Sequence, residues 1–385
     1  LFHCRDCVKR SSVDTLQLHF LAQRFSHGQI SDPVAETHMT TEIKKKPERI
    51  LSGMQATGEL HLGHYLGVLT NFVALQNEAQ CFFMVANLHS LTAFYPNYQD
   101  AHRFIAPMVA DWLAAGISPE KAVVFVQSDV PEHAELAQLL AMFTPLSWLE
   151  RNPTYKDKQA NTEKDLDSFG FLGYPVLQAA DIVLYNATHV PIGEDQLPHL
   201  ELTREIARRF NHFYGRHEGE RAAEKDVLTV PQAILSEYPK VMGLDGRKMS
   251  KSYNNSIVLS ESAESVTKKM MVMKTDTARV RRNDPGNPEN CPVFSYYDFF
   301  APELKNEVNT GCRSAALGCV DCKKQLTARV VEKLAPFRAK REELASKSEF
   351  LNEVLHHGAA EARKVAGETL KRVKDAMGMV TRYSL

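Results

Sequence analysis

The sequence of 385 residues lacks long apolar runs, because no uninterrupted apolar stretch reaches the ~18 residues that span a bilayer. This absence excludes a membrane protein with helical spans. The sequence also lacks a large net charge, which is −1, so any nucleic-acid contact must come from a local patch. Apolar residues make up 44% and charged residues 24%, which excludes collagen-like, coiled-coil and wholly disordered chains.

Cysteine is scarce, and seven residues are too few for a disulfide-stapled secreted domain of this length. Four of them are clustered with the spacing C-x20-C-x6-C-x2-C: Cys291, Cys312, Cys319 and Cys322. Clustered cysteines in a large chain more often bind metal than form disulfides. Four thiolates fit tetrahedral zinc or a [4Fe–4S] cluster equally well by ligand count, and the alternative is a set of free thiols.

Residues 1–38 lack the apolar core of a signal peptide and carry acidic residues, which a transit peptide avoids. Met39 opens a stretch that is typical of a natural N-terminus. We therefore expect residues 1–38 to be an extension, flexible or non-native, whose deletion leaves folding and activity intact. Cys4 and Cys7 form a C-x-x-C pair, but no convincing second half of a zinc site follows them.

Apolar runs alternate with amphipathic segments from residue 50 onward. The runs predict buried strands at 49–54, 81–87, 122–127 and 189–192, and the segments between them predict helices at 65–77, 100–115 and 198–210. This alternation over ~200 residues predicts an α/β fold with a parallel, doubly wound sheet. Residues 150–170 are polar and predict a surface loop, and no internal repeat is present.

From about residue 302 the pattern is mostly helical. Residues 301–385 carry 16 Lys and Arg against 11 Asp and Glu, while the remainder of the chain is net acidic. This distribution favours a catalytic body followed by a basic tail that meets an anionic partner. The alternative is an ordinary solvated helical surface.

The chain has no G-x-x-x-x-G-K-[ST] sequence, which excludes a Walker-type nucleotide site. A different phosphate site is predicted after the first strand, where Gly53 and Gly58 permit a tight backbone turn. His61 and His64 follow, three residues apart, and so share one face of a first helical turn. Free N–H groups at a helix N-terminus attract phosphate. The alternative for this histidine pair is a structural or metal-binding role.

The second phosphate-binding element is the string Lys248-Met249-Ser250-Lys251-Ser252, which follows a glycine-rich turn at 243–246. Two lysines three residues apart suit neutralisation of a leaving pyrophosphate, because a long flexible stem lets the charge follow the phosphate. A lone K-x-x-K pair is usually a solvated face, but here it is combined with the glycine and histidine segment.

At these residues the chain resembles a known family. His61-Leu62-Gly63-His64 resembles the HIGH motif of class I aminoacyl-tRNA synthetases, and residues 248–252 match their KMSKS motif. Four segments resemble the tryptophanyl-tRNA synthetase family in particular: residues 52–67, 174–185 (YPVLQAADIVLY), 190–196 (VPIGEDQ) and 201–210 (ELTREIARRF). The resemblance runs from about residue 48 to the C-terminus and does not cover 1–38.

The resemblance implies a cytoplasmic homodimer with a Rossmann-type catalytic domain at 39–240, a KMSKS loop at 241–260 and a helical anticodon-binding region at 261–385. It implies that the L-tryptophan carboxylate attacks the α-phosphate of Mg²⁺-bound ATP and releases pyrophosphate. The terminal ribose of tRNA(Trp) then takes the aminoacyl group. No side-chain nucleophile is needed, because catalysis consists of positioning and charge neutralisation.

The same resemblance assigns roles in nucleotide binding. It assigns catalysis to His61, His64, Lys248 and Lys251, and ATP binding to these four together with Gln55, Gly63, Lys158, Asp195, Met249 and Ser250. Gln55 would lie near the α-phosphate. Lys158 falls where similar enzymes carry a further phosphate-binding lysine, and its alternative is an exposed loop charge.

Tyr174, Gln178 and Asp181 lie at i, i+4 and i+7, on one face of a predicted helix. A buried carboxylate there is costly without a partner, and an indole N–H is a donor of the right kind. The resemblance implies that Asp181 binds the indole nitrogen, that Tyr174, Gln178 and Gln196 line the pocket, and that Glu194 lies at its rim. Many family members carry Met where this chain has Gln178, which leaves the pocket wall open.

The resemblance favours a [4Fe–4S] cluster at the four clustered cysteines, with zinc as the second choice. Three rival functions remain: a tyrosyl-tRNA synthetase, an adenylate-forming transferase without tRNA, and a non-catalytic iron–sulfur or RNA-binding protein. Residues 179–181 and 190–196 favour tryptophan over tyrosine, and the basic tail favours a tRNA substrate. The intact Lys248 and Lys251 favour catalysis.

Overall fold

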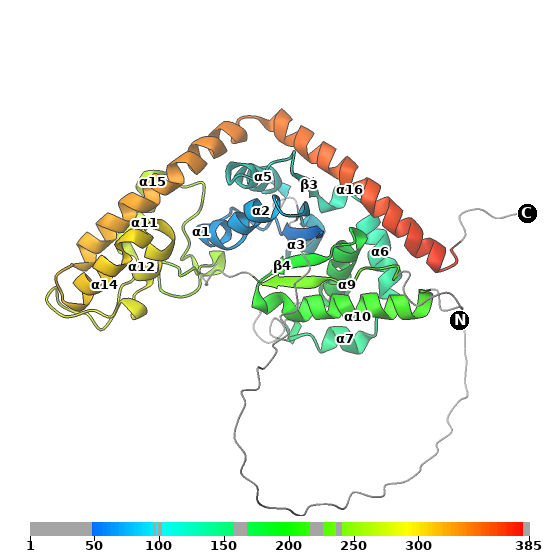
Figure 1. Ribbon diagram of the computed structural model, residues 1–385, viewed down its shortest axis with the longest axis horizontal. Coiled ribbons are helices and arrows are strands. Elements are labelled where there is room, and N and C mark those ends of the chain that lie inside the picture. Colours follow the sequence, from blue (N-terminus) through cyan, green and yellow to red (C-terminus); the bar gives the residue numbers. More distant parts are fainter. Residues whose placement is uncertain are drawn as a thin grey trace, which may run out of the picture. The chain divides into compact units, whose positions relative to one another are not determined.

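Five parallel strands form one sheet in the computed structural model, which describes residues 48–94, 98, 102–153, 155–156, 168–215, 226–235 and 241–379 (Figure 1). The strands are β1 Arg49–Met54, β2 Gln80–Val85, β3 Ala122–Val126, β4 His189–Ile192 and β5 Gln232–Leu235. Their order, β3-β2-β1-β4-β5, confirms the predicted doubly wound sheet. The strand order reverses between β1 and β4, which is where such sheets bind ligands.

Helices surround the sheet and make up the C-terminal part of the described chain. They are α1 Leu62–His64, the π-helical η1 Tyr65–Leu69, α2 Thr70–Leu75, α3 Asn87–Phe94, α5 Ile105–Ala114, η3 Gln127–Asp129, α6 Glu132–Ala141, α7 Leu146–Glu150, α9 Phe169–Leu184, η4 Glu194–Gln196, α10 Leu197–Tyr214, η5 Lys251–Tyr253, α11 Ala263–Val272, η6 Pro288–Asn290, α12 Pro292–Ser295, α13 Tyr297–Phe300, η7 Pro302–Leu304, α14 Lys305–Arg313, α15 Cys319–Ala345 and α16 Ser348–Ala376. None of the described helices is long and apolar enough to cross a membrane.

The strands are buried on both faces, so successive residues point into two different cores. Ile50 and Phe83 pack into the core that contains α2 and α5, whereas their neighbours Leu51 and Phe82 pack into the core that contains α6, α9 and α10. Figure 1 shows α2 and α5 on one side of the sheet and α9 and α10 on the other. This two-sided burial explains why the strands read as continuous apolar runs.

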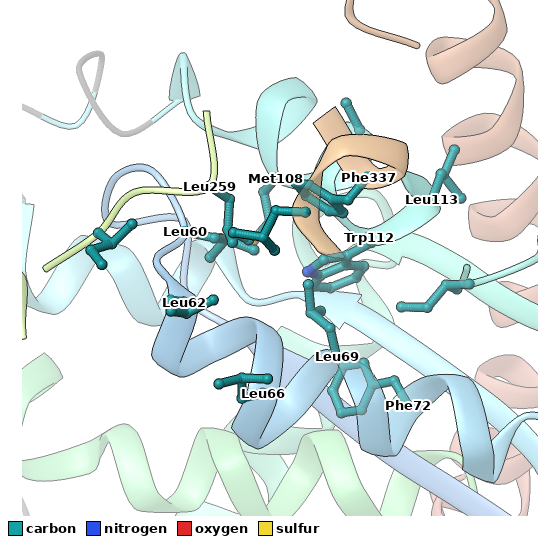
Figure 2. Close-up of a cluster of buried hydrophobic side chains, with 14 of the residues drawn as sticks. Leu60, Leu62, Leu66, Leu69, Phe72, Met108, Trp112, Leu113, Leu259 and Phe337 are labelled. Atoms are coloured by element: carbon teal, nitrogen blue, oxygen red, sulfur yellow. The ribbon is translucent and has the colours of Figure 1, made fainter. Parts of the chain in front are cut away.

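One core lies directly beneath the segment that carries the two histidines. Figure 2 shows Trp112 of α5 beside Leu69, in the same core as Leu60 and Leu62, and Trp112 is fully buried. Leu259, from beyond the second phosphate-binding string, and Phe337 of α15 close this core from other parts of the chain. The helix start at residue 62 is therefore supported by apolar packing as well as by its own hydrogen bonds.

The last two helices pack back onto the sheet and its helices. Arg341 of α15 donates from Nε to Oδ1 of buried Asp111 in α5, at 2.5 Å. α16 packs along β3, where Gly358 approaches the backbone of Val124 so closely that an added Cβ would lie 1.8 Å from the carbonyl oxygen. Only glycine allows the helix and strand backbones to come this close.

Candidate active site

The turn after β1 brings His61 and His64 together through a reciprocal helix cap. Nδ1 of His61 accepts from the backbone N–H of Gly63, and Nδ1 of His64 accepts from the backbone N–H of His61, both at 3.1 Å. Each neutral ring then carries its proton on Nε2, because one nitrogen is already an acceptor. The two rings stack with centroids 3.7 Å apart. The cap therefore leaves two Nε2–H donors at a helix N-terminus, which suits phosphate oxygens.

Both histidines are held neutral. Burial, and then the charge of Lys251, lower the pKa of His61 to about 4. Burial, and then the charges of His61 and Lys251, lower the pKa of His64 to about 2. The side chains thus act as hydrogen-bond donors at neutral pH without adding charge.

The KMSKS string lies against the histidine turn, although some 190 residues separate them in sequence. A Cβ atom added to Gly58, whose φ is +131°, would lie 3.4 Å from Nζ of Lys251. Next to the string, the backbone N–H of Leu62 donates to the carbonyl of Ile257 at 2.9 Å. Burial lowers the pKa of Lys251, and the nearby charges of Glu59 and Asp111 oppose this shift. The structure therefore brings the histidine turn and the KMSKS string together.

Asn255, which the sequence did not indicate, fixes the KMSKS string. Its Oδ1 accepts from the backbone N–H of Ser250 at 2.8 Å, and its Nδ2 donates to Asp245 at 2.7 Å and to the carbonyl of Lys248 at 3.2 Å. One amide thereby joins the turn before the string to the string itself. The pair of asparagines at 254–255 was the available signal, because asparagine is favoured in such turns.

The predicted residues after β4 lie at the carboxyl edge of the sheet, beside the end of β1. Glu194 and Asp195 are exposed in η4, and Gln196 is half-buried and donates to Asp195 at 3.0 Å. Gln55 follows β1 directly and is exposed. Since β4 pairs with β1, these residues border the crevice where the strand order reverses. Lys158 lies outside the described residues.

Helix α9 carries Tyr174, Gln178 and Asp181, and only Asp181 is fully buried. Nε2 of His199 donates to the hydroxyl oxygen of Tyr174 at 3.2 Å, because Nδ1 of His199 already accepts from Asn152 at 3.0 Å. Burial raises the pKa of Tyr174 to about 12. Tyr174 is thus a neutral, positioned hydroxyl near the start of the helix.

The carboxylate of Asp181 accepts from three side chains that sequence reasoning missed. Nε2 of His89 donates at 2.7 Å and Nδ1 of His133 at 2.6 Å, while Nε2 of Gln127 lies 2.8 and 2.9 Å from the two oxygens. Burial alone would raise the pKa of Asp181, but His133 and His89 outweigh it and hold that pKa well below its usual range. Asp181 is therefore an ionised, buried acceptor.

The three donors share a signal that was visible in the sequence. His89 lies in α3 just after β2, Gln127 directly follows β3, and His133 lies near the start of the next helix, α6. Polar residues that follow buried parallel strands collect at one edge of the sheet. Their convergence on Asp181, however, depends on how α9 packs and cannot be read from the strands alone.

The four clustered cysteines line one small pocket, and none of them forms a disulfide. Its other walls are mainly apolar and include Val293, Phe294, Val308 and Leu317. Nη1 of Arg279 lies 3.8 Å from Sγ of Cys312, and the buried Nε of Arg279 has no hydrogen-bond partner among the described residues. Within that described part, no three His, Cys, Asp or Glu side chains are arranged to hold a single metal ion.

Comparison with known proteins agrees with this geometry. The family described as "tRNA synthetases class I (W and Y)" matches residues 43–335. Tryptophan–tRNA ligases from Thermotoga maritima and Ralstonia nicotianae are 48% and 42% identical, and each match covers 86% of this chain and 99% of the relative. The crystal structure of tryptophanyl-tRNA synthetase from Campylobacter jejuni with ADP and tryptophan superimposes with a TM-score of 0.76 at 35% identity, covering 86% of this chain and 99% of that one. The chain therefore belongs to the class I tRNA synthetases of the tryptophan and tyrosine group, and within it to the tryptophanyl-tRNA synthetases.

Proposed function

We propose that the protein activates L-tryptophan with ATP, releases pyrophosphate, and transfers the tryptophanyl group to tRNA(Trp). The observation that carries this proposal is one sheet edge that joins two phosphate-binding elements to a buried carboxylate. His61 and Lys251 lie on the phosphate side, and Asp181 lies on the amino-acid side. A site with these two halves suits attack by the carboxylate of the amino-acid substrate on the α-phosphate of ATP.

In the activation step the side chains bind and neutralise, and none forms a covalent bond. The Nε2–H groups of His61 and His64 donate to phosphate oxygens, and Gln55 contributes near the α-phosphate. Lys248 and Lys251 neutralise the pyrophosphate as the bond to the α-phosphate breaks, which lowers the barrier chiefly in the transition state. Mg²⁺, which this family uses with ATP, supplies further positive charge at the phosphates. We propose that Lys158 and Asp195 complete this half of the site.

On the amino-acid side, Asp181 accepts the indole N–H. A carboxylate has about four acceptor positions, and one contact each from His89 and His133 and two from Gln127 occupy them, so the indole N–H replaces one of the two Gln127 contacts. Tyr174, Gln178 and Gln196 line the pocket, and Glu194 borders it. A site built on such a hydrogen bond rejects an analogue that lacks the partner by about 10⁴–10⁵.

ATP–pyrophosphate exchange with each of the twenty amino acids tests this function. We expect fast exchange with tryptophan alone and none with phenylalanine, which lacks a polar group to match Asp181. Faster exchange with tyrosine would identify a tyrosyl-tRNA synthetase instead. Exchange with tryptophan but no charging of tRNA(Trp) would identify an adenylate-forming transferase that does not use tRNA.

We propose further that the cysteine cavity holds a [4Fe–4S] cluster. Four thiols around an apolar space fit such a cluster, and the Nε–H of Arg279, which has no partner among the described residues, suits an inorganic sulfide as acceptor. Zinc is less favoured, because Zn–S bonds of about 2.3 Å need the four sulfurs to converge on one point. When bound, the cluster supplies folding free energy to the segment that its ligands enclose.

Metal content and colour test the cluster. Protein purified without oxygen is expected to be brown, with about four irons per chain, and Cys319→Ser is expected to lose most of this iron. Because residues 261–385 form the proposed anticodon-binding region, the variant should lose tRNA charging more than tryptophan activation. Colourless protein with stoichiometric zinc would refute the cluster, and protein without metal that still charges tRNA would refute the metal site.

We propose a homodimer that covers an exposed apolar recess beside α9. Phe169 is 80% exposed and Leu146 57% exposed, and both line this recess together with Leu88, Leu91, Val176 and Leu177. A contiguous apolar surface of this kind is typical of a protein interface. Phe169→Asp is expected to sediment as a monomer, while the control Val272→Asp, at a residue 77% exposed outside the recess, stays dimeric. An unchanged mass for Phe169→Asp would place the interface elsewhere.

A further inference from the structure

Behind Asp181 the hydrogen bonds continue to two residues that the proposed chemistry does not use. His133 is completely buried, with its Nδ1 2.6 Å from Oδ1 of Asp181 and its Nε2 2.7 Å from the hydroxyl of Tyr185. Tyr185 is also completely buried, and its ring stacks on Phe82 of β2 with centroids 4.7 Å apart. A linear chain of three groups thus runs from the sheet core to the carboxylate.

The direction of each hydrogen bond follows from the chemistry of the groups. An ionised carboxylate can only accept, so Nδ1 of His133 carries the proton and donates to Asp181. Nε2 of a neutral His133 is then an acceptor, and the Tyr185 hydroxyl must be its donor. Asp181 therefore fixes the tautomer of His133, and Tyr185, as the donor to Nε2, holds its ring in place from the other side.

We infer that His133, fixed by Tyr185, is a positioning residue that holds the Asp181 carboxylate in the orientation that accepts the indole N–H and so sets the preference for tryptophan. This inference rests on the proposal that Asp181 binds the indole nitrogen.

The contacts separate His133 from the other two donors. His89 lies in a helix beside the pocket, where its ring meets the edge of Tyr174 at a centroid distance of 6.4 Å. Among the residues that the structure describes, His133 has no such ring contact with a pocket residue, and its ring packs on Phe125 of β3, with centroids 6.0 Å apart, on the core side of Asp181. A donor on the core side can stay in place when substrate binds. Loss of this donor would let the carboxylate rotate about the χ2 torsion of Asp181, because the preferred values of that torsion are spread over a broad range.

The experiment compares four variants with two substrates. Asparagine places an amide N–H where His133 has Nδ1–H, so His133→Asn keeps the donor to Asp181, whereas His133→Leu removes it. The substrates are L-tryptophan and its isostere in which sulfur replaces the indole N–H. Kinetics are measured by pyrophosphate exchange per active site, titrated by adenylate formation. The preference is the ratio of kcat/KM for the two substrates, so partial unfolding does not change it.

We expect His133→Leu to lower this preference about 10- to 100-fold, mainly through a higher KM for tryptophan, because one charge-assisted hydrogen bond to Asp181 is lost. His133→Asn is expected to retain the preference within about threefold. Tyr185→Phe keeps the ring but removes the donor to Nε2, so it should give a smaller loss of the same kind. This variant also tests the inference if His133→Leu does not fold.

Asp181→Leu, which removes both acceptor oxygens, separates this inference from the proposal beneath it. If Asp181→Leu abolishes the preference while His133→Leu and Tyr185→Phe retain it, His133 is merely structural and the inference is wrong. If Asp181→Leu itself retains the preference, Asp181 does not bind the indole nitrogen, and both the proposal and the inference fail.

Discussion

Replacement of Gly358 by alanine is the substitution for which the structure gives the sharpest expectation. Gly358 lies in the interior of α16, where alanine would ordinarily stabilise a helix by about 1 kcal/mol relative to glycine. Here an added Cβ would lie 1.8 Å from the carbonyl oxygen of Val124 and 2.7 Å from its carbonyl carbon. Both atoms belong to the backbone of β3, so neither can move without shifting the strand or the helix.

The clash must therefore be relieved by separating α16 from β3 by more than an ångström. Overpacking of a well-packed core costs typically about 1–3 kcal/mol, and the cost is greater where backbone atoms meet. The loss of packing outweighs the gain in helix propensity, so we expect a net destabilisation of about 1–3 kcal/mol. Because β3 leads directly into Gln127, a donor to Asp181, the KM for tryptophan should rise as well.

Gly367→Ala is the matched control, because Gly367 lies in the interior of the same helix and an added Cβ would meet nothing within 4 Å. This variant should gain about 0.5–1 kcal/mol. The measurement is urea unfolding followed by tryptophan fluorescence, for which Trp112 is a buried reporter in the core. If Gly358→Ala proved as stable as Gly367→Ala, the close approach of α16 and β3 would be wrong.

Three further predictions concern the nucleotide half of the site. Lys251→Ala is expected to lower kcat for pyrophosphate exchange ~10²–10³-fold with little change in the KM for tryptophan, and the opposite pattern would assign Lys251 another role. Asn255→Ala removes the amide that joins Ser250 of the KMSKS string to Asp245 and should lower kcat about tenfold, whereas an unchanged kcat would show that the string is held by other contacts. The pKa of His61 is about 4 in the folded protein, whereas the ordinary value is 6.5. As the pH drops, His61 is therefore protonated in the unfolded chain before it is protonated in the folded protein. The free energy of unfolding consequently falls between about pH 6.5 and pH 4. Across this pH range the urea midpoint should fall less steeply for His61→Asn, which retains a capping acceptor, than for the unsubstituted protein. Equal slopes for the two proteins would contradict a neutral His61 in the cap.

The sequence predicted those parts of the fold that depend on short-range patterns. The strands expected at 49–54 and 189–192 have the same bounds in the structure, because their apolar runs end at glycine or polar residues. β5 was missed, since it has only four residues and lies at the sheet edge, where its apolar pattern is short. The helical turn expected at His61 and His64 is present, and the helix expected at 65–77 continues from it, so that helical structure runs from Leu62 to Leu75.

The site was predictable to the extent that its residues lie in continuous motifs. The histidine turn and the KMSKS string were found because each is a local arrangement with its own chemistry. Asn255 and the donors to Asp181 were missed, since each matters only through a partner distant in the sequence, such as His89 with Asp181 at a separation of 92 residues. Tertiary packing, which no single segment encodes, brings these partners together.

The two halves of the site therefore respond differently to changes in packing. The proposed phosphate half consists of two local motifs that meet in a few contacts, so its geometry survives as long as Lys251 lies beside the histidine turn. The proposed tryptophan half needs donors from three separate elements that converge on Asp181, and two of these elements follow β2 and β3 directly. A shift of the sheet by a fraction of an ångström lengthens those hydrogen bonds at once. Substitutions in the core around β3 should consequently impair recognition of tryptophan before they impair binding of ATP.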